Sequence, residues 1–186
     1  MFDFLVAAMA LAAQPAPTAA TEMLRIDVPD EFQVGYHHRT AHGDLMEMVV
    51  PPETVDNWST LITGLDFFDT AKVGVENFYP IWRRGMIAAC PGMTETFAKG
   101  TVDGHRAIKG VLSCPLNPRT NKPENLTAIF VQGDVNLLNV QVAFRHNVGA
   151  KDQALIDRIS ASLKVCDQQA MDACTARKAM GFVVAR

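Results

Sequence analysis

The sequence predicts an α+β fold, in which an antiparallel β-sheet has two main helices packed on it. Short segments alternate apolar and polar residues, most clearly in residues 32–37 and 140–144, and turn residues separate them. Two longer segments, residues 75–89 and 151–165, repeat apolar residues at helical spacing. Since these elements share 186 residues, a length suited to one core, we expect a single domain.

The first expected elements are strands. Residues 32–36 and 45–50 form a hairpin with its bend near residues 41–44, and Pro51-Pro52 ends it. A further strand is expected at residues 59–67, because apolar or β-branched residues recur there at every second position: Leu61, Thr63, Leu65 and Phe67.

The first expected helix contains six apolar residues at helical spacing: Val75, Phe78, Tyr79, Trp82, Met86 and Ala89. Pro80 lies among them, and a proline inside a helix removes a hydrogen bond. We therefore expect the helix to begin near Tyr79, with Pro80 in its first turn, and to end at Pro91-Gly92.

Two more hairpins and a helix are expected after it. The expected strands span residues 94–99, 106–114, 126–132 and 137–145, and the hairpin turns lie at residues 102–104 and 133–134. The stretch SCPLNPRTNKPEN, residues 113–125, contains three prolines and three asparagines and is interpreted as a stiff loop that crosses between the hairpins. The last helix is expected at residues 151–165, with Leu155, Ile156, Ile159 and Leu163 on one face.

The N-terminus has the pattern of a signal peptide. Residues 4–13 are apolar, long enough for the hydrophobic region of a signal but too short to span a bilayer. Small residues suited to cleavage occur at residues 10–12 and 18–20, although no Lys or Arg precedes the apolar run. We expect residues 1–20 to be a signal peptide, residues 21–186 to be the domain, with a weakly patterned extension at 167–186, and the protein to be periplasmic or secreted, with no stable membrane span after cleavage.

Four cysteines, an even number in an exported chain, predict disulfides. If residues 102–104 form a hairpin turn, Cys90 and Cys114 lie almost opposite each other at the open end of that hairpin, within bonding reach. Cys166 and Cys174 can then pair only if the last helix ends near Asp167 and the chain turns back. The alternative pairs Cys166 with Cys90 or Cys114 and leaves one thiol free.

Two groups of residues are candidate binding sites. His37, His38 and His42 lie around a bend and are candidate metal ligands, although surface histidines of a hairpin give the same pattern. The second group is basic and falls into two clusters, Arg83 with Arg84 and Arg119 with Lys122. Either cluster is a candidate for clamping a carboxylate or phosphate, and solvated charges give the same pattern.

Several function classes lack their motifs. The sequence contains no phosphate loop, dinucleotide fingerprint, nucleophile elbow or HExxH motif, and nothing in it indicates a cofactor. The net charge is −3 without a basic stripe, so we expect no nucleic-acid partner.

Five segments carry a resemblance to known proteins: GYHHR (35–39), TVDNW (54–58), AACPG (88–92), SCPLNPRTNKPEN (113–125) and VQVAFRH (140–146). They resemble uncharacterised small exported proteins of Gram-negative bacteria, and the element order resembles the fold of the PsbP, Mog1 and DcrB families. The resemblance implies an accessory or binding role and gives no active-site residue.

We therefore expect a non-enzymatic binding or accessory module of the cell envelope, with an envelope protein or a small ligand as its unknown partner. Two alternatives stay open. One is a small-ligand or metal-binding periplasmic protein that uses His37, His38 and His42, and the other is a hydrolase with an unrecognised site.

Overall fold

The computed structural model of the chain describes residues 22–167. In chain order its elements are β1 (Glu22–Arg25), β2 (Gln33–Arg39), β3 (Gly43–Val49), β4 (Thr60–Phe67), the short 3₁₀ helix η1 (Ala71–Val73), α1 (Val75–Ala89), β5 (Thr94–Val102), β6 (His105–Asn117), β7 (Lys122–Gln132), β8 (Leu137–Phe144), α2 (Ala150–Ser162) and β9 (Lys164–Asp167).

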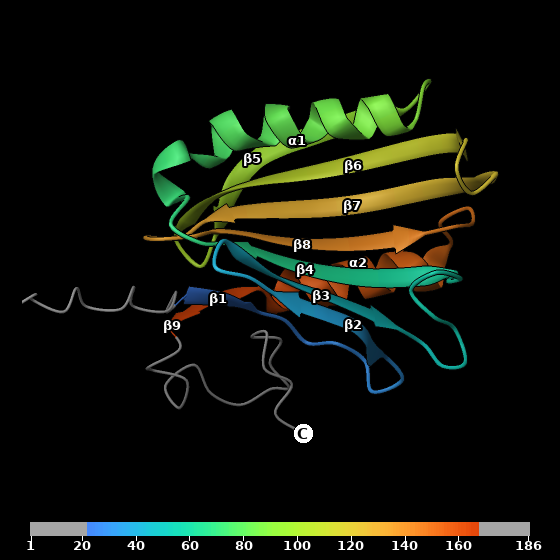
Figure 1. Ribbon diagram of the computed structural model, residues 1–186, viewed down its shortest axis with the longest axis horizontal. Coiled ribbons are helices and arrows are strands. Elements are labelled where there is room, and N and C mark those ends of the chain that lie inside the picture. The colour runs from blue at the N-terminus through green and yellow to red at the C-terminus, as the bar shows by residue number, and fades with distance from the viewer. Residues whose placement is uncertain (1–21, 168–186) are drawn as a thin grey trace, which may run out of the picture.

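Seven strands form one antiparallel sheet in the order β2-β3-β4-β8-β7-β6-β5 (Figure 1). The strands β1 and β9 form a separate two-stranded antiparallel sheet. The predicted α+β class, with an antiparallel sheet and two helices, is confirmed.

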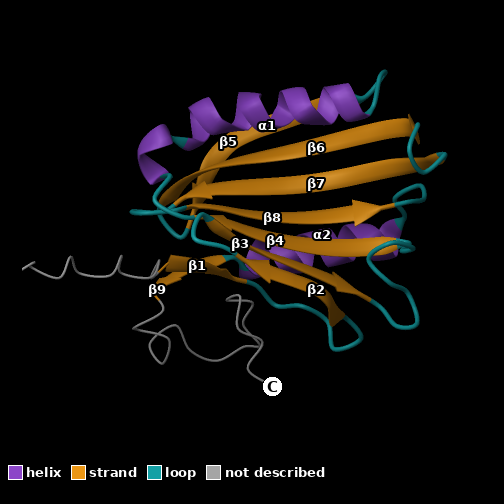
Figure 2. Ribbon diagram, in the orientation of Figure 1, coloured by secondary structure: helices purple, strands orange, loops and turns teal. Residues whose placement is uncertain are grey.

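The two helices lie on opposite faces of the large sheet and enclose two cores (Figure 2). On one face, Val75 and Tyr79 of α1 pack against β6 and β7, with Phe130 at the centre. On the other face, Ile156 and Ile159 of α2 pack with β1, β9 and the backs of the sheet strands. Because alternate side chains of a strand point to opposite faces, each central strand supplies residues to both cores.

The first hairpin, the strand β4 and the turn before β6 agree with the predicted positions. Met46 and Met48 of β3 are buried in the core between the sheet and α2.

The helix α1 begins at Val75, so the predicted start near Tyr79 was wrong. Gly74 precedes it with a φ of 80°, and the side-chain oxygen of Gln132 accepts a hydrogen bond from the Val75 amide at 3.2 Å. Pro80 lies inside the helix on its exposed side, where water can reach the carbonyl that a proline leaves without its donor.

The segment 113–125 is not a crossover loop, and this prediction was also wrong. It forms the ends of β6 and β7 and the tight turn between them, so the four strands β5–β8 make one continuous meander. The Asn117 carbonyl accepts the amide of Asn121 at 2.8 Å, and Asn121 has a positive φ of 54°, which asparagine tolerates well.

The last helix ends at Ser162 rather than at residue 165. Leu163 is extended, with a ψ of 127°, and residues 164–167 continue as β9, which pairs with β1 in a register that sets Met23 opposite Cys166. Apolar spacing alone extended the predicted helix, because Leu163 is buried as an inward helical residue would be.

The expected signal peptide at residues 1–20 and all but the first residue of the extension at 167–186 lie outside the described residues. Over residues 22–167, no helix has both the length and the apolar character needed to cross a membrane.

Candidate functional site

A pocket of about 380 Å³ lies between the C-terminal half of α1 and the sheet. We call it the α1 pocket. The residues that line it come from α1, from the turn after it, from Trp58 and from five strands: Leu45, Glu47, Trp58, Leu61, Thr63, Leu65, Met86, Ala89, Cys90, Met93, Leu112, Cys114, Asn117, Glu124, Leu126, Gln141 and Ala143.

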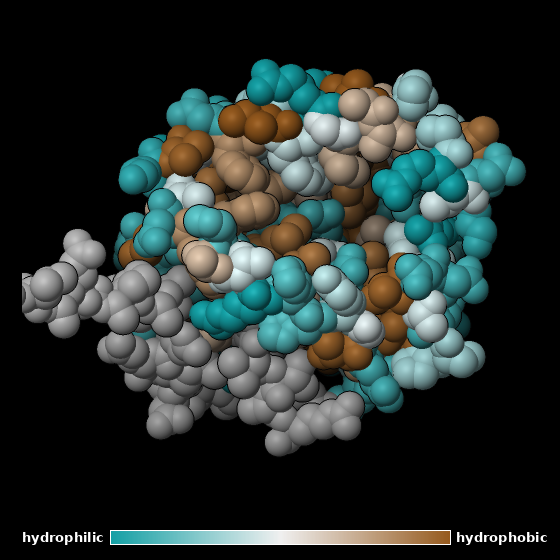
Figure 3. Space-filling model, in the orientation of Figure 1, coloured by the Kyte–Doolittle hydropathy of each residue, from teal (hydrophilic) through white to brown (hydrophobic). Residues whose placement is uncertain are grey.

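The pocket exists because α1 covers only part of its face of the sheet. The helix packs mainly on β6 and β7 and reaches β4 near its N-terminal end, where the rings of Phe78 and Phe67 lie 4.8 Å apart. Figure 1 shows that α1 does not extend over most of β8, β4 and β3. The buried anchors Val75 and Tyr79 both belong to the N-terminal half of α1, so space is left beneath its C-terminal half. Figure 3 shows apolar side chains in the hollow between the helix and the strands.

The floor of the pocket is mostly apolar. Leu45 comes from β3, Leu61 and Leu65 come from β4, and Ala143 comes from β8. In each strand the residues between these positions face the other core, as Met46 and Ile62 do. The alternation of the strands thus gives one apolar surface to the core and a second one to the pocket.

One acidic side chain, Glu47 of β3, lies on this floor. In the sheet it is flanked by Tyr36 of β2 and Thr63 of β4. Burial raises the pKa of the Glu47 carboxyl above its usual value, and the negative charge of Asp56 adds to this effect. The Glu47 carboxylate makes no hydrogen bond or ion pair with the side chains and backbone of residues 22–167.

A stacked cation, Arg145, contacts two of the residues that line the pocket, Trp58 and Glu124. The guanidinium group of Arg145 lies 3.9 Å from the centre of the Trp58 ring, and its Nε lies 3.5 Å from Oε1 of Glu124. Trp58 is buried against Val49 and Leu61. Arg145 therefore joins the loop before β4 to strand β7, and it is paired with Glu124.

A disulfide fixes the C-terminal end of α1, which covers the pocket, to strand β6. Cys90, at the end of α1, is bonded to Cys114 of β6, with 6.0 Å between the Cα atoms. The hairpin register predicted this pair, and the structure contains it. The bond excludes the alternative in which Cys166 pairs with either of these cysteines. Cys166 is buried, and the pairing with Cys174 stays a prediction because residue 174 lies outside the described residues.

The two predicted basic clusters lie on α1 and at the β6–β7 turn, outside the α1 pocket. Arg83 forms an ion pair with the buried carboxylate of Glu95, which also accepts a hydrogen bond of 2.6 Å from the Tyr79 hydroxyl. Arg84 is exposed on α1, and Arg119 and Lys122 are exposed at the β6–β7 turn. None of the four lines the α1 pocket, and their role in binding an anion stays a prediction.

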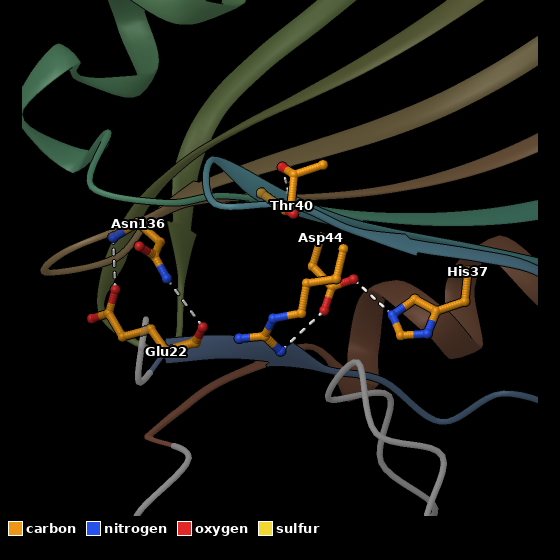
Figure 4. A network of polar contacts seen from close by, with 7 residues as sticks. Glu22, His37, Thr40, Asp44 and Asn136 are labelled. Atoms are coloured by element: carbon orange, nitrogen blue, oxygen red, sulfur yellow. Dashed lines mark hydrogen bonds and ion pairs between the residues drawn. The ribbon is translucent and has the colours of Figure 1, made fainter. Parts of the chain in front are cut away.

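The three predicted histidines are likewise not assembled as metal ligands. His37 contacts Asp44 at 2.7 Å, and Arg39 pairs with the same carboxylate at 3.3 Å (Figure 4). His38 and His42 are exposed, at the edge strand and at the bend. Residues 22–167 contain no group of three or more His, Cys, Asp or Glu side chains arranged to hold a metal ion.

The polar network of Figure 4 has a structural role. The carboxylate of Glu22 accepts hydrogen bonds from the backbone amides of Asp134, Val135 and Asn136 at 2.7–2.9 Å. The side-chain oxygen of Asn136 in turn accepts a hydrogen bond of 3.1 Å from the backbone amide of Asp69. These contacts tie β1 to the β7–β8 turn and to the segment between β4 and α1.

Sequence reasoning did not find the α1 pocket. The alternation of Leu61, Thr63 and Leu65 indicated an apolar strand face but not that α1 leaves this face partly uncovered. Glu47, between Met46 and Met48, was the one available signal, since it places a charge on the strand face opposite the core.

Comparison with known proteins supports the fold. No family model matches the chain, and no curated protein matches it. Among solved structures the chain is similar to the Ran-binding protein Mog1p of Saccharomyces cerevisiae, at 10% identity and a TM-score of 0.52, over 79% of this chain and 92% of that one. LpqN, involved in cell envelope biogenesis of Mycobacterium tuberculosis, matches 81% of this chain and 87% of its own at 15% identity, but its TM-score of 0.46 is too low to carry an argument. The similarity to Mog1p shows the fold alone: this chain has a Mog1-like α+β architecture.

Proposed function

We propose that the protein is a non-enzymatic binding module, exported to the cell envelope, which holds a small and largely apolar ligand in the α1 pocket. The observation that carries this proposal is the pocket itself. Its volume of about 380 Å³ falls within the range of roughly 300–1,000 Å³ found for ligand sites, near the lower end. Its lining combines many apolar side chains with a few polar groups, the composition typical of such sites.

Two features favour a preformed site. The disulfide holds the C-terminal end of α1 at the sheet, and the stacked Arg145 holds the Trp58 loop beside it. A ligand that enters such a site has little protein ordering to offset, which favours affinity. The disulfide also supports a location outside the cytoplasm, because oxidising compartments preserve such bonds.

Fluorescence titration with N-phenylnaphthylamine, an uncharged apolar dye, tests the proposal. We expect saturable binding of one dye per chain. The Ala143→Phe substitution, which adds an aromatic ring to the pocket floor, should abolish it. The matched control is Ala98→Phe on the exposed strand β5, which should bind the dye like the natural protein.

A second measurement guards against an Ala143→Phe variant that does not fold. Amide chemical shifts of the unsubstituted chain should change on dye addition at β3, β4 and β8, around the pocket. No binding, or shifts confined to other surfaces, would refute the proposal.

A further inference from the structure

Glu47 gives the α1 pocket a chemical preference. Its carboxylate lies on an apolar floor and has no partner of opposite charge among the described residues. A half-buried carboxylate in this state is costly, since it has lost part of its water without gaining a compensating contact. A ligand that supplies a cation at this point would provide the missing contact.

The charged residues of the pocket lining are all negative among the described residues. Glu124 is the second carboxylate there, and the described lining residues include no Lys, Arg or His. The nearby cation Arg145 is already engaged by Glu124 and by the Trp58 ring. Asp56 adds a further negative charge close to Glu47. An anionic ligand would therefore meet repulsion and no free positive charge.

We propose that the natural ligand class of the α1 pocket is an amphipathic cation, an aliphatic or aromatic group bearing a protonated amine, whose ammonium pairs with Glu47 while its apolar part lies on Leu45, Leu61 and Leu65. This inference rests on the proposed function above. The small volume suits a single chain or ring system rather than a lipid with two chains. Aliphatic amines are protonated at neutral pH, as the lysine side chain is.

Displacement of the dye by three probes of equal chain length tests the charge preference on the full chain. The probes are octylamine, octanol and octanoate, used below the concentrations at which they aggregate. We expect octylamine to displace the dye at concentrations about tenfold lower than octanol does, which corresponds to one charge-assisted contact. Octanoate should be the weakest of the three.

The variant Glu47→Gln should remove the advantage of octylamine over octanol, with both displacements measured against the dye affinity of the variant itself. The matched control Glu31→Gln makes the same change of net charge at an exposed site away from the pocket and should keep the preference. Equal displacement by octylamine and octanol in the natural protein, or a preference that survives Glu47→Gln, would overturn the ligand class. The proposed function would then still stand if the dye binds, whereas failure of every probe and of the dye would refute both.

Discussion

The ring of Tyr79 occupies the space that a side chain at residue 110 would need. Gly110 lies on β6 directly beneath α1, and a Cβ atom built there would collide with the Tyr79 hydroxyl. The hydroxyl is held in place by its hydrogen bond to Glu95, which is also paired with Arg83. The close approach of helix and sheet at this point sets the height of α1 over the pocket.

We therefore expect Gly110→Ala to destabilise the fold. The added methyl group forces the Tyr79 ring away from Glu95, and overpacking of this kind costs about 1–3 kcal/mol in the free energy of unfolding. Urea unfolding measures it. Gly100→Ala is the matched control, because an added Cβ at residue 100 meets nothing within 4 Å. Equal stability of the two variants would contradict the packing argument.

Loss of the disulfide should weaken both stability and binding. A bond that spans 24 residues of sequence adds about 2–4 kcal/mol by restricting the unfolded chain. We expect the double variant Cys90→Ser, Cys114→Ser to unfold at lower urea concentration and to bind the dye more weakly, because the end of α1 is no longer fixed to β6. Unchanged dye affinity in a folded double variant would show that packing alone holds the C-terminal end of α1 over the pocket.

The buried carboxyl of Asp66 predicts that acid stabilises this part of the fold. Burial raises its pKa well above the usual value, the neighbouring Asp44 adds to the rise, and one carboxyl oxygen has no hydrogen-bond partner. At a pH between the ordinary pKa of an aspartate and the raised pKa of Asp66, the folded state therefore holds a proton that the unfolded state has released. This contribution is fully present below about pH 4 and is lost as the pH rises through the raised pKa of the folded state.

Asp66→Asn should remove this dependence. We expect its melting temperature to exceed that of the natural protein by a few °C at about pH 8 and to show a smaller difference at about pH 4. Asp103→Asn, at an exposed turn position with a positive φ of 51°, is the control and should not alter the pH profile. A constant difference between Asp66→Asn and the natural protein at all pH values would contradict the titration argument.

The stacking of Arg145 on Trp58 predicts that lysine cannot replace this arginine. Lysine keeps the charge but lacks the planar group that lies over the Trp58 ring. Arg145→Lys should therefore lower the free energy of unfolding by about 0.5–2 kcal/mol and lower the dye affinity. Thermal melting and the dye titration measure the two effects. Arg106 forms an exposed surface ion pair with Glu76, so Arg106→Lys is the control. Its melting temperature and dye affinity should equal those of the natural protein within error.

Export predicts a processed N-terminus. Expressed with its own first residues in a Gram-negative host, the protein should appear in the periplasmic fraction with an intact mass that lacks residues 1–20 or 1–12. A Leu5→Arg variant breaks the apolar run and should stay in the cytoplasm at full mass. Full-length natural protein in the cytoplasm would refute export.

Local patterns predicted the fold well where short-range chemistry decides it. The turn at residues 102–104 fixed the β5–β6 register closely enough to pair Cys90 with Cys114. The failures arose where partners are distant in sequence. Pairing of β1 with β9 joins residues about as far apart as the described chain allows, and four-residue strands carry little periodic signal.

The site was harder to predict for a related reason. A pocket is space left between elements, and the height of α1 above the sheet depends on Gly110 meeting Tyr79, a contact between two elements. The prolines and asparagines of residues 113–125 also favoured a loop, although the β6 and β7 ladder extends through much of this stretch.

The disulfide also limits how a ligand can exchange. One end of α1 is bonded to β6 through Cys90, and the other is seated on the core by Val75 and Tyr79, so neither end is free to swing outward as a lid would. In the proposed binding function, a ligand would enter over strands β3 and β4, which contribute Leu45, Glu47 and Leu65 to the pocket lining. The rate of ligand exchange would then be governed by side-chain motion at that opening. Reduction of the disulfide would release the C-terminal end of α1 from β6 and allow it to move away from the sheet.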